Sequence, residues 1–208
     1  MSVRELSHFI GGKRIPGTSG RFADVFDPNT GQVQARVPLA DRSETEAAIA
    51  NAADAQKEWA SWNPQRRARV LMRFLQLIQE EMDPLARLLS SEHGKTIPDA
   101  KGDIQRGLEV VEFATGIPHL LKGEYTEGAG SGIDVFSMRQ PLGVVAGITP
   151  FNFPAMIPMW KFAPAIACGN AFILKPSERD PRPAELIFEL IDGIDELPDG
   201  VLNLVHGS

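Results

Sequence analysis

An α/β fold with a parallel sheet is predicted for this chain of 208 residues, mainly by the pattern of its carboxy-terminal third. Apolar segments of strand length at 143–148, 171–175 and 201–205 alternate with helical segments at 154–168 and 182–191. Strands that alternate with helices indicate parallel pairing through right-handed crossovers. We therefore expect a Rossmann-like sheet with helices on both faces.

The preceding residues are expected to pack around this sheet. Strand-like pieces separated by turn formers between Phe9 and Leu39 predict a β meander. Ser43 and Glu46 have the spacing of a capping box at the start of a helix. Apolar residues at helical spacing, with proline and glycine at the boundaries, predict helices over 43–61, 64–81, 84–93 and 97–121.

Residues 124–140, EYTEGAGSGIDVFSMRQ, alternate as two short strands around a glycine turn. Their place between a helix and a core strand predicts a protruding ribbon, and an exposed ribbon offers unpaired backbone groups to a partner subunit. Gly128, Gly130 and Gly132 lack the spacing and the following helix of a dinucleotide fingerprint. A flexible turn is the better interpretation.

Composition and charge favour a globular protein that acts on small ligands. The net charge of -6 and the pI near 5.3, without a long basic run, argue against nucleic acid or an anionic membrane as a partner. The prolines and polar residues within the apolar stretch at 142–175 argue against a membrane span. The single Cys168 and the lack of a secretory pattern at the amino terminus predict a reducing, cytoplasmic setting. The four histidines lack ligand spacing, so no metal site is expected.

Polar residues follow two of the predicted strands, at the end where parallel sheets bind ligands. Asn152 follows the first strand, and Lys175, Ser177 and Glu178 follow the second, which is the outline of a cofactor site. Each has an ordinary alternative. Asn152 could cap the helix that Pro154 opens, Lys175 could be a boundary residue, and Glu178 could complement the next helix N-terminus.

The motifs PFNFP at 150–154 and GNAFILKPSE at 169–178 resemble the amino-terminal part of the aldehyde dehydrogenase superfamily, and the likeness covers nearly the whole chain. Within it, EHGKT, DAKGDIQRGLEVVEFA and ILKPSERDP are most similar to the CoA-acylating methylmalonate-semialdehyde dehydrogenases. This resemblance implies an NAD-dependent oxidation of methylmalonate or malonate semialdehyde, with CoA as co-substrate and propionyl-CoA or acetyl-CoA as product. It also implies a homo-oligomer.

The resemblance assigns roles to individual residues. Asn152 matches the amide that donates to the developing oxyanion, a task that suits a neutral donor held at a strand end. Arg106 matches an arginine that binds the substrate carboxylate, although an arginine between Asp103 and Glu109 on a helix is also an ordinary ion-pair former. The residues that match cofactor contacts are Thr149, Phe151, Lys175, Glu178 and Arg179.

The family's nucleophilic cysteine and general-base glutamate are expected after Ser208. Residues 1–123 and 141–208 then form the amino-terminal part of the NAD-binding domain, residues 124–140 an oligomerisation ribbon, and the catalytic domain lies outside this sequence. Cys168 is expected to be an inert, buried thiol, the segment 201–205 to border an unfinished sheet, and the chain alone to be inactive. Two alternatives stay open: a non-catalytic binding or oligomerisation module, and a non-acylating aldehyde dehydrogenase.

Overall fold

The structure is a computed structural model that describes residues 3–208. Its central element is a five-stranded sheet with the strand order β3-β2-β10-β9-β8. Strands β8, β9 and β10 are parallel, whereas β2 pairs antiparallel with β10 and β3 antiparallel with β2. The strands are β2 His8–Ile10, β3 Lys13–Ile15, β8 Val144–Ile148, β9 Ala171–Lys175 and β10 Leu202–Leu204.

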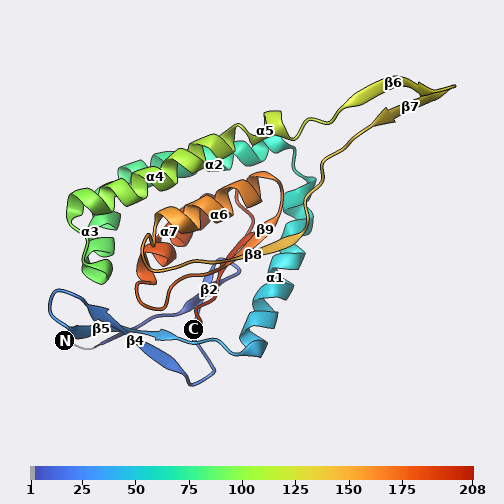
Figure 1. Ribbon diagram of the computed structural model, residues 1–208. Helices are drawn as coiled ribbons and strands as arrows, with labels where there is room; N and C mark the ends of the chain where they lie inside the picture. The colour runs from blue at the N-terminus through green and yellow to red at the C-terminus, as the bar shows by residue number, and fades with distance from the viewer. Residues whose placement is uncertain (1–2) are drawn as a thin grey trace.

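Two smaller sheets are separate from the central one. Strand β1 (Arg4–Glu5) pairs parallel with β5 (Gln32–Pro38), which pairs antiparallel with β4 (Phe22–Asp27). Strands β6 (Tyr125–Gly130) and β7 (Ile133–Phe136) form an antiparallel ribbon that projects far from the body of the molecule (Figure 1). The predicted protruding ribbon is confirmed.

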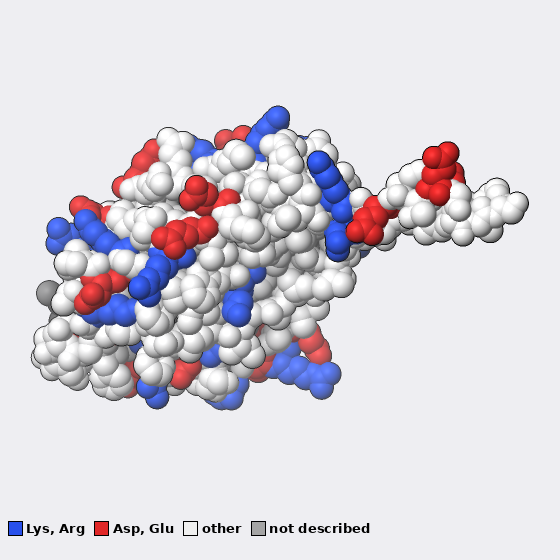
Figure 2. Space-filling model, turned by 45° about the horizontal axis from the view of Figure 1, so that its top comes forward, with Lys and Arg blue, Asp and Glu red and all other residues white. Residues whose placement is uncertain are grey.

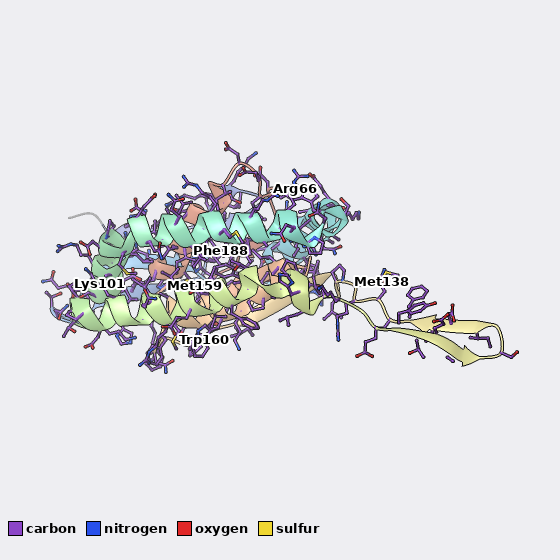
Figure 3. All side chains as sticks on the ribbon, turned by 90° about the horizontal axis from the view of Figure 1, so that it is seen from above. Arg66, Lys101, Met138, Met159, Trp160 and Phe188 are labelled. Atoms are coloured by element: carbon purple, nitrogen blue, oxygen red, sulfur yellow. The ribbon has the colours of Figure 1, made fainter. Side chains whose placement is uncertain are left out.

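Helices cover both faces of the central sheet, as the sequence predicts. Helix α1 packs on one face, and α6 and α7 pack on the other (Figure 1). Helices α2 and α4 lie side by side over α6 and form an outer layer (Figure 3). The helices are α1 Arg42–Ser61, α2 Pro64–Glu80, α3 Met82–His93, α4 Ile97–Thr115, α5 Ile117–Leu120, α6 Met156–Ala167 and α7 Arg182–Asp192.

The core lies between the sheet and the two helical layers. Phe162 of α6 packs edge-on against Phe74 of α2 and Phe188 of α7, with ring centroids 5.7 and 5.4 Å apart. All three rings are fully buried, and burial of a large apolar side chain contributes roughly 1.5–3 kcal/mol. Trp59 of α1 donates from Nε1 to the carbonyl of Ile166, 2.8 Å away, and so joins the two faces of the sheet.

Helix boundaries differ from the sequence prediction in several places, and helix α3 begins at Met82 instead of residue 84. The capping box of α1 uses Asp41 and Glu44 instead of Ser43 and Glu46, because the Asp41 carboxylate accepts from the Glu44 amide at 3.0 Å and Glu44 accepts from the Asp41 amide at 2.9 Å. The predicted helix over 97–121 breaks at Gly116 into α4 and α5. Helix α6 begins at Met156, two residues after Pro154.

The predicted meander and the unfinished sheet edge were both wrong. The amino-terminal strands divide between two sheets. Strand β2 of the β2–β3 hairpin pairs with the edge of β10 that was expected to be unpaired, with Leu204 opposite Phe9. Val201 and Leu202 are fully buried as a result. The outer parallel strand is β8, where the side chain of Ile148 is 78% exposed.

No helix in the described part of the chain is long and apolar enough to cross a membrane. Residues 3–208 also contain no group of His, Cys, Asp and Glu side chains that could hold a metal ion. On the face shown in Figure 2, basic and acidic residues alternate over the body without a large patch of one sign.

Candidate active site

The predicted cofactor residues meet at the carboxyl ends of the parallel strands. Ile148 lies opposite Lys175 in the β8–β9 register, and the amide of Thr149 donates to the carbonyl of Lys175 at 3.1 Å. The same end of the sheet holds a cavity of about 410 Å³, which is lined by Lys175 and by His206 and Gly207 after β10. Three neighbouring strands thus deliver their following loops to one place, as parallel sheets do at ligand sites.

Lys175 and Glu178 form a half-buried pair in this region. The Lys175 ammonium lies 3.4 Å from Glu178 Oε2 and donates to the carbonyl of Gly207 at 3.2 Å. Burial raises the pKa of Glu178, but a hydrogen bond from its own amide and the charge of Lys175 outweigh this, so the pKa lies below its ordinary value. An ionised carboxylate beside an ammonium provides acceptors and donors for the hydroxyl groups of a ligand.

Phe151 and Arg179 also come together, from the loops after β8 and β9. The Arg179 guanidinium lies over the Phe151 ring, 4.9 Å from its centroid, in a cation-π contact. The Phe151 side chain is 47% exposed, so the pair forms part of the surface at this end of the sheet. Thr149 beside it is buried, and its hydroxyl has no hydrogen-bond partner within residues 3–208.

Asn152 is exposed in the loop 149–155, which connects β8 to α6. The alternative that Asn152 caps the helix is wrong, because the N-cap position of α6 is Ala155 and no side chain of the helix's own N-cap bonds there. The main-chain carbonyl of Asn152 accepts a hydrogen bond from Lys95 at 2.8 Å. The Asn152 carboxamide is therefore exposed on a loop whose backbone is bound by Lys95, a residue distant in the sequence.

Arg106 lies on the exposed side of α4 and lines a second cavity of about 310 Å³. Phe153, the neighbour of Asn152, lines the same cavity, so the loop and Arg106 share one depression. The ion-pair alternative for Arg106 was wrong. Asp103 pairs with Lys95 at 2.7 Å, and none of the ion pairs in the described residues includes Arg106.

Sequence reasoning missed the contacts of Lys95 and Asp103, which bind the Asn152 carbonyl and the Met156 amide at the start of α6. It also missed a buried acidic pair, Glu92 and Asp180, at the amino end of α7. Burial raises the pKa of Glu92 to about 8. Burial also raises the pKa of Asp180 to about 8, against a lowering hydrogen bond with Ser177 and with a further rise from Glu92. The only sequence signal was charged residues beside helix boundaries, which are ordinarily solvated.

Cys168 is half-buried at the carboxyl end of α6, away from the loop that carries Asn152. Burial raises the pKa of its thiol, and the nearby Arg67 guanidinium offsets this only in part. A thiol with a raised pKa is a poor nucleophile at neutral pH, because the thiolate is the reactive form. The structure therefore gives Cys168 no catalytic environment.

The family model described as the aldehyde dehydrogenase family matches residues 15–208, which include every residue of the candidate site. The chain belongs to the aldehyde dehydrogenase family. Among curated members, malonate-semialdehyde dehydrogenase of Pseudomonas aeruginosa is 52% identical over 203 residues, and the match covers 98% of this chain and 40% of that protein. The acylating, mitochondrial methylmalonate-semialdehyde dehydrogenase of Arabidopsis thaliana is 48% identical, with 98% and 33% covered.

Solved structures of family members superpose closely on the chain. A protein assigned as methylmalonate-semialdehyde dehydrogenase of Sinorhizobium meliloti 1021, in complex with NAD, has a TM-score of 0.98 and 62% identity, with 100% of this chain and 42% of that one covered. Methylmalonate-semialdehyde dehydrogenase from Oceanimonas doudoroffii has a TM-score of 0.96 and 47% identity, with 99% and 42% covered. The chain thus spans less than half the length of these relatives.

Proposed function

We propose that this chain contributes the cofactor side and the oxyanion donor of an NAD-dependent, CoA-acylating dehydrogenase for malonate or methylmalonate semialdehyde. The observation that carries the proposal is the convergence of the loops after β8, β9 and β10, which brings Thr149, Phe151, Lys175, Glu178 and Arg179 to one end of the sheet. The names and high identity of the relatives support the choice of substrate.

The residues at the strand ends suit an NAD molecule. Lys175 uses two of its three donors within the chain, on Glu178 and Gly207, and Glu178 carries the charge that accepts bonds from ribose hydroxyls. We infer that this pair binds the adenosine ribose and that Thr149, Phe151 and Arg179 contact the rest of the dinucleotide. When bound, NAD supplies the hydride acceptor.

The proposed role of Asn152 is to donate its amide to the aldehyde oxygen as that oxygen gains negative charge. A preorganised neutral donor stabilises this charge without carrying a charge of its own. Arg106, which shares a cavity with Phe153, is proposed to pair with the substrate carboxylate. A guanidinium binds a carboxylate bidentately and so distinguishes a semialdehyde acid from a neutral aldehyde.

The remaining chemistry is assigned to segments outside this sequence. There a cysteine thiolate adds to the aldehyde carbon, hydride leaves, and the resulting thioester passes to the thiol of CoA. The substrate carboxylate departs as CO₂ and a proton takes its place, so methylmalonate semialdehyde gives propionyl-CoA and malonate semialdehyde gives acetyl-CoA. A general-base glutamate is expected in the same segment.

The test is product analysis with the complete protein. Methylmalonate semialdehyde, NAD and CoA should give NADH and propionyl-CoA in equal amounts. Release of a free carboxylic acid in both the presence and the absence of CoA would support the non-acylating alternative. No NADH with either semialdehyde, from a folded protein, would contradict the proposed function.

The ribbon of β6 and β7 supports a second role, in assembly. Its large apolar side chains are exposed, with Tyr125 at 64%, Phe136 at 68% and Val135 at 52%, and it projects clear of the body (Figures 1 and 2). Exposed apolar strands favour pairing with another subunit. We propose that residues 124–140 mediate homo-oligomer formation. Val135→Asp should reduce the assembly size in size-exclusion chromatography with light scattering, and an unchanged size would contradict the role.

A further inference from the structure

The loop 149–155 and the first residue of α6 are held by an ion pair that lies outside both. Lys95 Nζ donates to the carbonyl of Asn152 at 2.8 Å and to Asp103 Oδ2 at 2.7 Å. The other oxygen of Asp103 accepts from the amide of Met156 at 2.8 Å. The Lys95 ammonium also lies over the ring of Phe153, 4.0 Å from its centroid. These contacts fix the backbone from the Asn152 carbonyl to the start of α6.

Both charged residues are themselves rigidly placed. Lys95 follows Gly94, which ends α3 in the left-handed conformation with φ of 84°, and its carbonyl accepts from Ser90 Oγ at 2.7 Å. Thr96 then caps α4 and sets the direction of that helix. Asp103 lies on the inner side of α4 with a fully buried side chain, and the Lys95 side chain is 14% exposed.

The contact with Met156 replaces a missing helix cap. Helix α6 has no side-chain cap from its own N-cap residue, so its own N-cap does not satisfy the amide of Met156. The Asp103 carboxylate binds this amide and places a negative charge at the positive end of the helix. The start of α6, and with it the end of the Asn152 loop, is thereby tied to α4.

Stability alone is a weak reason for such an arrangement. Removing two charges from water costs about as much as their attraction returns, so a buried ion pair commonly adds little net stability. It does impose one geometry, because both carboxylate oxygens and two ammonium protons have specified partners. Catalysis by a hydrogen-bond donor depends strongly on such preorganised placement.

We propose that Lys95 and Asp103 are positioning residues, which hold the Asn152 backbone so that its carboxamide points at the aldehyde oxygen. This inference rests on the proposed role of Asn152. It assigns neither residue a contact with substrate, although Lys95 and Asp103 both line the cavity that Arg106 also lines. A direct contact of Lys95 with the substrate carboxylate is the competing explanation, and a neutral substrate separates the two.

The experiment is a double-mutant cycle in the complete enzyme, with Lys95→Met and Asn152→Ala singly and together. Propionaldehyde, which has no carboxylate, serves as substrate, and kcat for NADH formation is measured. Lys95→Met should lower kcat about 10-fold in the wild-type background and less than about 2-fold when Asn152 is already alanine, since coupled residues are non-additive. Asp103→Asn, which keeps an acceptor for Met156, should lower kcat less than Lys95→Met does.

Lys101→Met is the matched control, because Lys101 lies on the same helix as Asp103 but pairs with Asp83 at 2.5 Å, away from the loop. It should leave kcat unchanged. Equal losses from Lys95→Met with and without Asn152, or a loss seen only with the semialdehyde acid, would overturn the positioning role. A wild-type kcat in a folded Lys95→Met enzyme would do the same.

A wild-type enzyme that oxidises propionaldehyde but not the semialdehydes would contradict the proposed substrate while leaving this test intact. Circular dichroism and the NAD dissociation constant identify variants that fail to fold. Should Lys95→Met not fold, Lys95→Arg keeps the charge and changes only the geometry. It should then show the same coupling to Asn152→Ala, and additive losses would overturn the proposal.

Discussion

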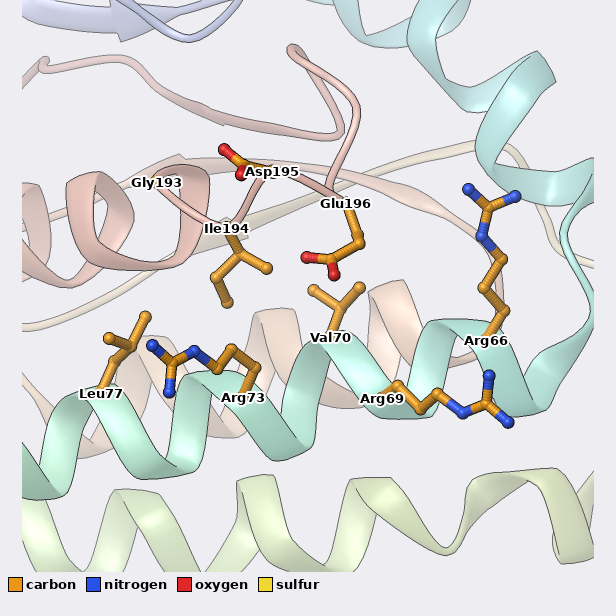
Figure 4. Close-up of a pocket in the computed structure, with 9 residues that line it drawn as sticks. All are labelled: Arg66, Arg69, Val70, Arg73, Leu77, Gly193, Ile194, Asp195 and Glu196. Atoms are coloured by element: carbon orange, nitrogen blue, oxygen red, sulfur yellow. The ribbon is translucent and has the colours of Figure 1, made fainter.

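The two ends of the parallel sheet differ in how their polar side chains are held. At the carboxyl end, cavities of about 410 and 310 Å³ lie beside the loops that follow β8, β9 and β10. At the amino end, a larger cleft of about 530 Å³ lies between α2 and the loop that leads from α7 to β10 (Figure 4). Volume alone would favour the amino end as the functional site.

The charged side chains of the larger cleft make few contacts with one another. Arg66, Arg69 and Arg73 are exposed along α2, and no ion pair within residues 3–208 joins them to Asp195 or Glu196 on the facing loop. Arg73 donates to the exposed Gln76, and Arg66 stacks on the ring of Trp62. These are ordinary contacts of a solvated helix surface.

At the carboxyl end, by contrast, charged side chains bind the backbone of the loops beside them. Lys175 donates to Gly207, Lys95 to Asn152, and Asp103 accepts from Met156. The two ends therefore differ in whether charged side chains fix the loops beside them, and this difference favours the carboxyl end as the proposed site. The predictions below test this difference.

The largest effect is expected from Asn152→Ala in the complete enzyme. Loss of one preorganised oxyanion donor lowers kcat by about 100-fold to 1000-fold. Steady-state NADH formation with methylmalonate semialdehyde measures the change, and the NAD dissociation constant should be unaffected. A decrease below about 3-fold would contradict the assigned role.

Arg106→Ala should weaken binding of the semialdehyde acid and leave the chemical step unchanged. Loss of a hydrogen bond to a charged group costs about 1.5–3 kcal/mol, so KM for the semialdehyde acid should rise about 10-fold to 100-fold. KM for propionaldehyde should stay within about 2-fold. Arg87→Ala on α3 is the control, because it removes an arginine from another helix. Equal increases for both substrates would show that Arg106 does not bind the carboxylate.

Asp180→Asn should stabilise the protein by an amount that grows as the pH rises from about 4 to about 8. The folded pKa of Asp180 is about 8 against an ordinary 3.8, because burial disfavours its charged form. The stability that this protonated carboxyl allows is fully present below pH 3.8 and is lost progressively until the pH has risen through about 8. Asparagine carries no such charge, so the thermal midpoints should match near pH 4 and differ by about 2 °C or more at pH 8.5.

The control for that measurement is Asp195→Asn, an exposed carboxylate at the amino end of the sheet. It should show no pH-dependent difference in the thermal midpoint. Equal midpoints for wild type and Asp180→Asn at both pH values would mean that folding does not raise the pKa of Asp180.

The smallest effect is expected from the arginines of the larger cleft. Arg69→Ala should change kcat and KM by less than about 2-fold, because exposed charges without defined partners contribute little. Steady-state kinetics with both semialdehydes measure this. A decrease in kcat/KM above about 10-fold would show that the amino end of the sheet carries a functional group, contrary to the difference between the two ends described above.

Local patterns account for most of what could be predicted. The helices follow from apolar spacing and from breakers such as Gly94 and Pro64, whose effects act within a few residues. The polar residues after β8 and β9 could be grouped because adjacent parallel strands end at one edge. The helix boundaries were less predictable. Asp41 and Ser43 both suit an N-cap, and only the folded backbone conformation shows that Asp41 has this role.

By itself, then, the sequence determined the alternation of strands and helices, the projecting ribbon, and the residues Asn152, Lys175 and Glu178 at the strand ends. Only the tertiary structure decided that β2 pairs with β10 and that Lys95 and Asp103 hold the Asn152 loop. The physical reason is the range of the contacts. Helical spacing and turns depend on near neighbours, whereas Lys95 and Asn152 are 57 residues apart and meet only because α4 packs on α6.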